Sequence, residues 1–203
     1  MCSSDLIRST PPNTEKYTPP EEMLSWQRLT PEELAGLNYF KSENCVSCHP
    51  GGGQKGIGPD LTEIPEMHRS PAWLVPHFKR PAEVVPGSAM PTINLRDTEL
   101  NALSLFVLKL SPDDEKELMS APDYALRGAV IYQNSRCAAC HELRGTGKKV
   151  GPALDGIANR HDQMWLIQHF KDPQGVTKGS KMPPYRFNDA DMEAITKYLL
   201  NLP

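Results

Sequence analysis

The chain has 203 residues, 38% hydrophobic and 23% charged, with a formal net charge of −3. This length suffices for one ordinary domain or two small ones. No cluster of basic residues along the chain indicates a nucleic-acid surface, and no apolar run approaches the ~20 residues of a membrane span. The 20 prolines and 14 glycines predict a loop-rich chain with short helices.

The N-terminal segment MCSSDLIRST lacks the positive, apolar and cleavage regions of a signal peptide. Cys2 is a candidate lipid anchor, but no signal precedes it. One back-translation of residues 1–6 resembles the tail of a common sequencing adapter, so we expect them to be an artefact and the natural chain to begin further upstream. After these six residues the chain is Pro-rich and polar up to residue 27. Residues 1–27 are therefore predicted to form an extended leader or tether.

The first predicted unit covers residues 28–112. Its first helix begins at Thr30, an N-cap followed by Pro and by the capping-box residue Glu33, and it leads into a pair of cysteines. A second helix opens at Ser70 and carries Trp73. The last helix, over 98–110, has an apolar stripe at helical spacing, formed by Leu100, Leu103, Val107 and Leu110.

A short helical linker is predicted over 113–121, and the second unit, 122–203, then repeats the first at an offset of 92 residues. CVSCH at 45–49 returns as CAACH at 137–141, and WLVPHFKRP at 73–81 returns as WLIQHFKDP at 165–173. The closing helix repeats the stripe with Met192, Ile195, Leu199 and Leu202. No segment alternates convincingly as a strand does, so the predicted fold class is all-α.

Four of the five cysteines lie in the two CxxCH motifs: Cys45, Cys48, Cys137 and Cys140. Two thiols at this spacing share one helical turn, where they can form thioethers to the two vinyl groups of one porphyrin edge. The adjacent histidine, His49 or His141, then reaches the iron. CxxCH is the attachment signature of c-type haem, so the motifs predict two covalently bound haem c groups.

A second axial ligand follows from an equal spacing in the two units. Met90 lies 41 residues after His49, and Met182 lies 41 residues after His141. Each methionine precedes a proline on a loop that contains Gly-Ser, just before the last helix. His/Met ligation is typical of electron-transfer cytochromes.

With these motifs, the chain resembles the class I cytochrome c family in two tandem copies over residues 28–203. The resemblance implies two domains, each a few short helices wrapped round one covalent haem. It also implies that the four motif cysteines hold the haems, that His49 and His141 are proximal ligands, and that Met90 and Met182 are distal ones.

Further residues of the site come from the same resemblance. The family places a proline carbonyl against the proximal imidazole N–H, which fixes the orientation of the ring. The matching prolines, in GPDL and GPAL, are Pro59 and Pro152. Trp73 and Trp165 are expected to pack beside the haems as core aromatics, with a propionate as a candidate partner of the indole N–H.

Other interpretations of the same residues remain open. A zinc site would use Cys, Cys and His with His77 or His169 as the fourth ligand, but it leaves the Met-Pro loops unexplained. A redox disulfide explains neither the histidines nor the spacing. His77 and His169 as axial ligands would make the haems bis-His and lower their potentials. We favour half-buried helix positions for these two histidines, bonded to a propionate or the backbone.

Two haems with both axial positions filled leave no open site for a substrate, which favours electron transfer and predicts no catalytic residue. Haem c is attached outside the cytoplasm, so we expect the periplasmic side of a membrane, with association through an upstream segment or a partner subunit.

Three functions compete for such a protein. Stretches such as HFKRPAEVVPGSAMP resemble the two-haem module of cytochrome b-type quinol oxidoreductases, which makes a cytochrome b-type membrane subunit the expected partner. One alternative is a free shuttle that delivers electrons to a terminal oxidase. Another is a dihaem peroxidase, which needs two unlike haems, so the near-identical Met loops argue against it.

Overall fold

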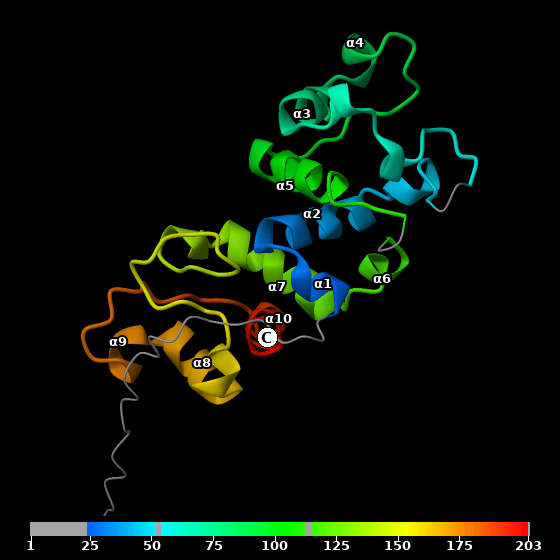
Figure 1. The fold of residues 1–203 in the computed structure, drawn as a ribbon. Coiled ribbons are helices and arrows are strands. Elements are labelled where there is room, and N and C mark those ends of the chain that lie inside the picture. The colour runs from blue at the N-terminus through cyan, green and yellow to red at the C-terminus, as the bar shows by residue number, and fades with distance from the viewer. Residues whose placement is uncertain (1–23, 52–53, 113–114, 203) are drawn as a thin grey trace, which may run out of the picture.

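The computed structural model describes residues 24–51, 54–112 and 115–202 (Figure 1). Residues 1–6 and nearly all of the predicted leader therefore lie outside the described residues. Within the described ranges the chain forms helices and turns, with one isolated bridge between Leu143 and Thr146 as the sole β-pairing. The all-α prediction is confirmed.

The elements repeat in the order that the sequence predicts. The first unit contains α1 (Ser25–Arg28), α2 (Pro31–Ser42), α3 (Pro71–Lys79), α4 (Pro81–Val84) and α5 (Asp97–Val107). The second contains α7 (Asp123–Asn134), α8 (Gln163–Lys171), α9 (Pro173–Val176) and α10 (Asp189–Leu200). Between them lies α6 (Glu115–Met119), inside the predicted linker.

The predicted helix starts are present. The Thr30 side chain accepts a hydrogen bond from the Glu33 backbone N–H, and the Thr30 backbone N–H donates to the Glu33 carboxylate at 2.8 Å. Ser70 caps α3 in the same way, because its hydroxyl accepts the Trp73 backbone N–H at 3.2 Å. In the second unit Asp162 takes this role at the start of α8.

The last residues of the predicted leader are helical and packed, not extended. Ser25 already begins α1, and Trp26 is only 4% exposed. The Trp26 ring meets Tyr124 of the second unit edge-on, with 6.3 Å between ring centroids, and the Ser25 backbone N–H donates to Glu117 of α6 at 3.0 Å. Residues 25–28 are therefore part of the packed structure because Trp26 buries its indole there.

Four long helices form the centre of the molecule. Figure 1 shows them in the order α5, α2, α7 and α10, with α3 and α4 at one end of the row and α8 and α9 at the other. The predicted apolar stripes of α5 and α10 are buried, each residue 5% exposed or less. Gly36 and Gly128 permit the close helix crossings, since a Cβ at Gly36 would lie 2.1 Å from the Ala102 carbonyl oxygen.

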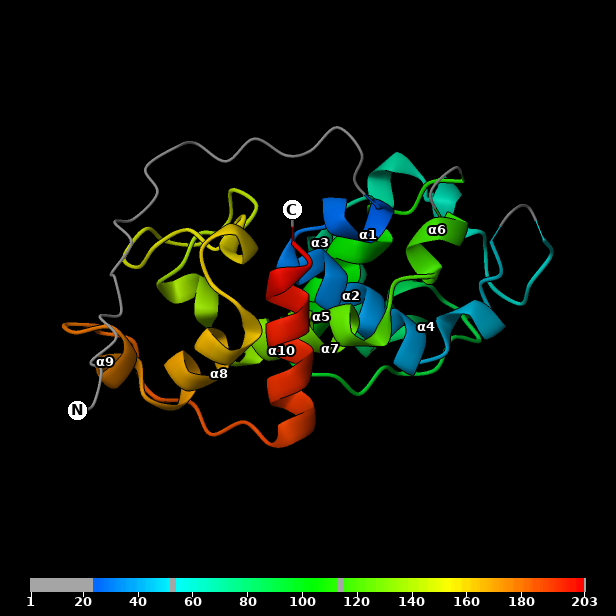
Figure 2. The ribbon, with the colours of Figure 1, turned by 90° about the horizontal axis from the view of Figure 1, so that it is seen from below.

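The two units are held together through α2 and α7, the first long helix of each. The Tyr39 hydroxyl donates to the Gln133 side-chain oxygen at 3.3 Å, and the Gln133 side-chain amide donates to the Thr98 carbonyl at 3.2 Å. The Arg96 guanidinium donates to the Asn134 side chain at 2.9 Å. Figures 1 and 2 place the first CxxCH segment and the second on opposite sides of the helix row.

None of the described helices is both long and apolar enough to cross a bilayer.

Candidate cofactor sites

A single tight turn presents both thiols and the histidine in each unit. After α2 ends, Asn44 adopts a left-handed conformation with φ of 53°, and Arg136 does the same after α7 with φ of 56°. A 3₁₀ turn follows, Cys45–Ser47 in the first unit and Cys137–Ala139 in the second. It closes with a bond of 2.9 Å from the histidine backbone N–H to the carbonyl of the first cysteine. The chain reversal at the left-handed residue is what brings Cys, Cys and His onto one face.

The four motif cysteines are free thiols in the structure. Burial raises the pKa of Cys45 to about 11 and the pKa of Cys137 to about 12. The first sulfur of each motif thus lies in an apolar setting that favours an uncharged form. A thioether is uncharged at every pH, so bonding to a porphyrin edge suits these two positions.

The two predicted proximal histidines have the same geometry in both units. His49 Nδ1 lies 2.8 Å from the Pro59 carbonyl oxygen, and His141 Nδ1 lies 2.8 Å from the Pro152 carbonyl oxygen. A carbonyl oxygen can only accept, so Nδ1 carries the proton and Nε2 keeps its lone pair for a metal. Each imidazole therefore has the orientation and the tautomer that a haem ligand requires.

Two glycines make room for these rings. A Cβ at Gly58 would lie 2.3 Å from His49 Cε1, and a Cβ at Gly151 would lie 2.6 Å from His141 Cε1. The backbone of each glycine also donates to the carbonyl of the second cysteine, at 2.8 Å in both units. Sequence reasoning assigned these glycines no role, although their repetition in IGPDL and VGPAL was a usable signal.

The methionine loops also match each other. The Met90 backbone N–H donates to the Ser88 hydroxyl at 3.3 Å, and the Met182 backbone N–H donates to the Ser180 hydroxyl at 3.2 Å. A glycine in left-handed conformation precedes each serine, with φ of 83° and 85°. Both methionines are half-buried against the core. The Gly-Ser pair thus sets the turn that holds the thioether inward, while the ligand role itself stays a prediction.

Each predicted site tryptophan lies between two histidines. Trp73 stacks on His68 and His77, with ring centroids 4.0 and 4.7 Å apart. In the second unit, Trp165 stacks on His161 and His169 at 3.4 and 4.5 Å. The sequence pattern gave no signal for this stacking of His68 and His161 on the tryptophans.

The histidines of the two stacks differ in one respect. Burial lowers the pKa of His77, and the nearby His49 and His68 lower it further. Its Nδ1 is buried without a hydrogen-bond partner among the described residues, whereas His169 Nδ1 lies 3.5 Å from the Thr177 hydroxyl. Burial also lowers the pKa of His169, so both rings are neutral near pH 7. Both rings are half-buried, as expected from the sequence. A half-buried, neutral imidazole near His49 or His141 fits a cofactor pocket that a flat ring system fills.

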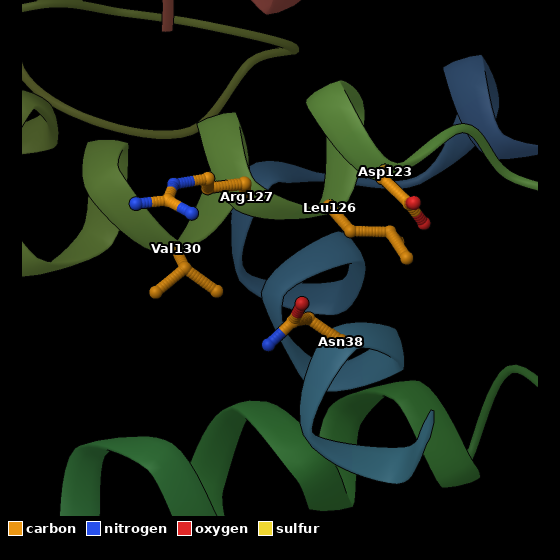
Figure 3. Close-up of a pocket in the computed structure, with 5 residues that line it drawn as sticks. All are labelled: Asn38, Asp123, Leu126, Arg127 and Val130. Atoms are coloured by element: carbon orange, nitrogen blue, oxygen red, sulfur yellow. The ribbon is translucent and has the colours of Figure 1, made fainter. Parts of the chain in front are cut away.

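Other candidate sites receive no comparable support. Nowhere in the described ranges do three His, Cys, Asp or Glu side chains gather as a zinc site would require. A shallow open hollow lies between α2 and α7 (Figure 3), lined by Asn38, Asp123, Leu126, Arg127 and Val130. These residues carry neither a thiol nor an imidazole, so the hollow offers no ligand to a haem.

Comparison with known proteins supports the same interpretation. The cytochrome c family model matches residues 34–111 and 125–203. Cytochrome c oxidase subunit 2 of Alkalihalophilus pseudofirmus (strain ATCC BAA-2126 / JCM 17055 / OF4) is 30% identical over 87 residues, which are 38% of this chain and 25% of that protein. The chain thus matches about a quarter of that relative's length. No solved structure matches significantly.

The two matched regions contain both CxxCH turns, both Gly-Pro segments and both methionine loops. Membership of this family implies electron transfer by covalently bound haem c. The chain belongs to the cytochrome c family and consists of two tandem cytochrome c domains.

Proposed function

We propose that the chain binds two haem c groups, one in each domain, and passes single electrons between them. The observation that supports this most strongly is the duplicated geometry of the sites. Both domains present two thiols and a histidine on one turn, and both histidines bond a proline carbonyl at 2.8 Å. A chain with one functional site would be free to lose this geometry in its second copy.

In this proposal each side chain has a defined role. Thioethers from the first and second cysteines would hold the porphyrin edge covalently. The Nδ1–H bond to Pro59 or Pro152 increases the basicity of the ligating Nε2 and holds the ring plane. Met90 and Met182 would supply the soft second ligand, which would favour a high potential. The bound haem iron contributes reversible one-electron chemistry.

The packing of the two domains suits a relay. The α2–α7 interface, with its bonds through Tyr39 and Gln133, fixes the distance between the two sites. The CxxCH segments lie on opposite sides of the helix row (Figure 2). In our proposal one partner reduces one domain while a second partner oxidises the other.

The proposed setting is a respiratory chain on the periplasmic side of a membrane. We assign the chain to the haem c module of a cytochrome b-type quinol oxidoreductase, because segments such as HFKRPAEVVPGSAMP resemble such modules. A second candidate is an oxidase-side carrier, which the match to cytochrome c oxidase subunit 2 favours. In both cases the partners are redox proteins.

Haem content and ligation can be tested on the purified chain. The pyridine haemochrome assay should give two haems for each chain. Met90→His and Met182→His should each lower one of two midpoint potentials, by a fraction of the ~0.8 V range that axial ligation spans. The matched control is Met67→His, at a methionine that is 80% exposed, and it should leave both potentials unchanged.

A single haem per chain would refute the proposal, and a titration of Met90→His or Met182→His identical to that of the unmodified protein would refute the axial assignment. The setting is tested separately by sequencing the genomic DNA upstream of codon 7. A reading frame that continues into apolar helical spans with paired histidines supports the quinol oxidoreductase module. A frame that begins with a signal peptide supports a free carrier.

A further inference from the structure

The two domains share one scaffold, but the core where their first and last long helices cross is apolar in one and polar in the other. In the first domain Phe40 of α2 meets Phe106 of α5 edge-on, with 5.3 Å between ring centroids, and neither ring is more than 1% exposed. At the matching positions of α7 and α10, 92 residues later, lie Tyr132 and Tyr198, each 1% exposed. The second domain therefore buries two tyrosines where the first buries two phenylalanines.

One of these tyrosines contacts the attachment turn of its domain. The Tyr132 hydroxyl donates to the His141 backbone carbonyl at 3.4 Å, whereas the Phe40 side chain has no donor to offer to His49. The hydroxyl thus places the positive end of its dipole beside the residue that is predicted to ligate the iron. The polar core of the second domain is joined in this way to the cofactor site.

Arg144 adds a full positive charge to this core. It lies three residues after His141, in a left-handed conformation with φ of 54°, and its backbone N–H donates to the Asp155 carboxyl at 3.2 Å. Its guanidinium Nε and Nη2 are buried and have no hydrogen-bond partner among the described residues. The charge of Arg144 reaches the core, because it opposes the rise in the pKa of Tyr198 that burial causes. It acts on that pKa more strongly than the carboxylate of Glu32 does.

The acidic side chains close to Arg144 in the chain and in space do not balance its charge. Asp155 accepts the Arg144 backbone N–H, and burial raises the pKa of its carboxyl, which favours the uncharged form. The neighbouring Glu142 pairs with Lys149 at 3.0 Å. The guanidinium thus keeps an unbalanced positive charge in a buried region, where a low dielectric constant strengthens its field.

The first domain has no cation at the matching position. Residues 51–53, the stretch that corresponds to Arg144, are three consecutive glycines, and Thr62 takes the place of Asp155. The Thr62 hydroxyl donates to the Asp60 carboxylate at 2.8 Å. Two sites that match in their histidines, prolines and methionines therefore differ in the charge held beside the histidine segment.

We propose that Arg144 raises the midpoint potential of the second site above that of the first, so that electrons enter at the first domain and leave from the second. This inference rests on the proposed function, because it orders the two haems that the chain is proposed to bind. A fixed positive charge favours the reduced iron, which carries one positive charge less than the oxidised iron. Burial and hydrogen bonds around the ligands are further means by which a protein sets such a potential, and the Tyr132 hydroxyl acts in the same direction.

The test compares variants of the purified holoprotein by spectroelectrochemical titration. Arg144→Gln removes the charge and should lower the higher of the two midpoint potentials. The expected loss is roughly tenfold in the equilibrium constant for reduction of that site, which is ~59 mV for one electron. Arg144→Lys keeps the charge and should retain the potential, whereas a purely structural role of the guanidinium would make the two variants alike. Arg144→Asn, a neutral residue that tolerates left-handed backbone, should repeat the shift of Arg144→Gln.

The matched control is Arg127→Gln, which makes the same charge change at an exposed position of α7. It should leave both potentials nearly unchanged, and any small effect should disappear near 1 M salt, where the Debye length is ~3 Å. The effect of Arg144→Gln should persist at that salt concentration, because Nε and Nη2 are buried.

A second measurement follows the same charge without a redox titration. Burial raises the pKa of the Asp155 carboxyl and the Arg144 charge opposes this rise, so NMR titration should find a higher Asp155 pKa in Arg144→Gln than in the unmodified protein. Arg127→Gln should leave that pKa unchanged. An Asp155 pKa that does not rise in Arg144→Gln would show that the guanidinium charge does not act on this core, and would overturn the inference.

The assignment of the two potentials to the domains uses the methionine variants. Met182→His should move the higher potential and Met90→His the lower one, and the reverse result would overturn the proposed order. An unshifted higher potential in Arg144→Gln, or an equal shift in Arg144→Lys, would also overturn it. A chain with one haem would instead contradict the proposed function, and the pyridine haemochrome assay on the same samples distinguishes that case.

Discussion

At the scale of single residues, Gly58 and Gly151 decide whether the proximal imidazole can lie flat against the backbone. Gly58→Ala or Gly151→Ala places a methyl group within 2.3 or 2.6 Å of the histidine Cε1. We expect each substitution to lower the free energy of unfolding by about 1–3 kcal/mol, since a close-packed site must shift to accept the added carbon. Denaturant titration of the holoprotein measures this cost.

The same substitutions should shift the midpoint potential of the affected domain, because the ring also turns relative to Pro59 or Pro152. The control is Gly145→Ala, where φ is 72° and nothing lies within 4 Å of the added Cβ. That control should cost about 1–2 kcal/mol through backbone strain alone and leave both potentials in place. Unaltered potentials in Gly58→Ala and Gly151→Ala would show that the glycines do not position the ligand.

Asp155 makes the stability of the second domain depend on pH. Asp155 is 9% exposed, and burial raises the pKa of its carboxyl group, although the Arg144 backbone N–H donates to it at 3.2 Å. A raised pKa means that the folded state binds more protons than the unfolded state, so this group reduces stability as pH rises through the raised value. We expect Asp155→Asn to gain stability relative to the unmodified protein between pH 4 and pH 7.

Thermal unfolding at several pH values checks this expectation. The amide keeps one oxygen that can accept the Arg144 N–H but cannot ionise. Asp189→Asn, at an exposed carboxylate in the same domain, is the control. Its difference in stability from the unmodified protein should not increase with pH in this way. If the difference in stability between Asp155→Asn and the unmodified protein is constant from pH 4 to pH 7, Asp155 keeps its ordinary pKa.

At the scale of elements, the helix crossing at Gly36 sets how closely α2 approaches α5. Alanine normally stabilises a helix by roughly 0.5–1 kcal/mol relative to glycine. Here the new Cβ would meet the Ala102 carbonyl oxygen at 2.1 Å and Phe106 Cβ at 2.7 Å. We therefore expect Gly36→Ala to destabilise the first domain by about 2 kcal/mol or more, against the intrinsic preference.

Equilibrium unfolding followed by circular dichroism measures this change. Asn38→Ala, two residues along on a half-buried face of the same helix, is the control and should be near neutral. Gly128→Ala should repeat the effect in the second domain, where the added Cβ would lie 2.3 Å from Tyr198 Cβ. A gain in stability of Gly36→Ala would mean that α2 and α5 can move apart without a loss of free energy of unfolding.

The elements also show what the sequence could predict. The sequence predicted the helix starts at Thr30 and Ser70, because capping is a local property. It also predicted the apolar stripes of α5 and α10, because helical periodicity is local as well. The attachment turns were predictable because their chemistry requires a fixed spacing. The stacking of His68 on Trp73 was not, since it depends on how the segment before α3 folds back onto it.

At the scale of the whole molecule, the packing of α2 on α7 was outside the reach of sequence patterns. The side chains that form hydrogen bonds between the domains here are polar: Tyr39, Arg96, Gln133 and Asn134. Polar side chains at this spacing are equally typical of a solvated face. Their partners lie in the other domain, which no periodicity within one unit could show.

Gln133 makes two of these bridging bonds, so Gln133→Ala should loosen the domains from each other. Loss of the bonds to Tyr39 and Thr98 should cost about 1–3 kcal/mol of interface stability. Amide hydrogen exchange should then accelerate in α2 and α7, the helices that share the interface, more than in α8, which lies away from it. In the proposed dihaem protein, electron exchange between the two sites should become more heterogeneous, because their separation is no longer fixed.

The control for this prediction is Lys197→Ala, which removes an exposed ion pair with Glu193 inside α10 and should leave exchange in α2 unchanged. Equal exchange rates in Gln133→Ala and the unmodified protein would mean that apolar packing alone joins the domains, with Trp26 on Tyr124 as the next contact to remove. If the prediction holds, the polar bridge is what keeps two sites on opposite sides of one rigid body. Two sites held in this way can serve two different partners at the same time.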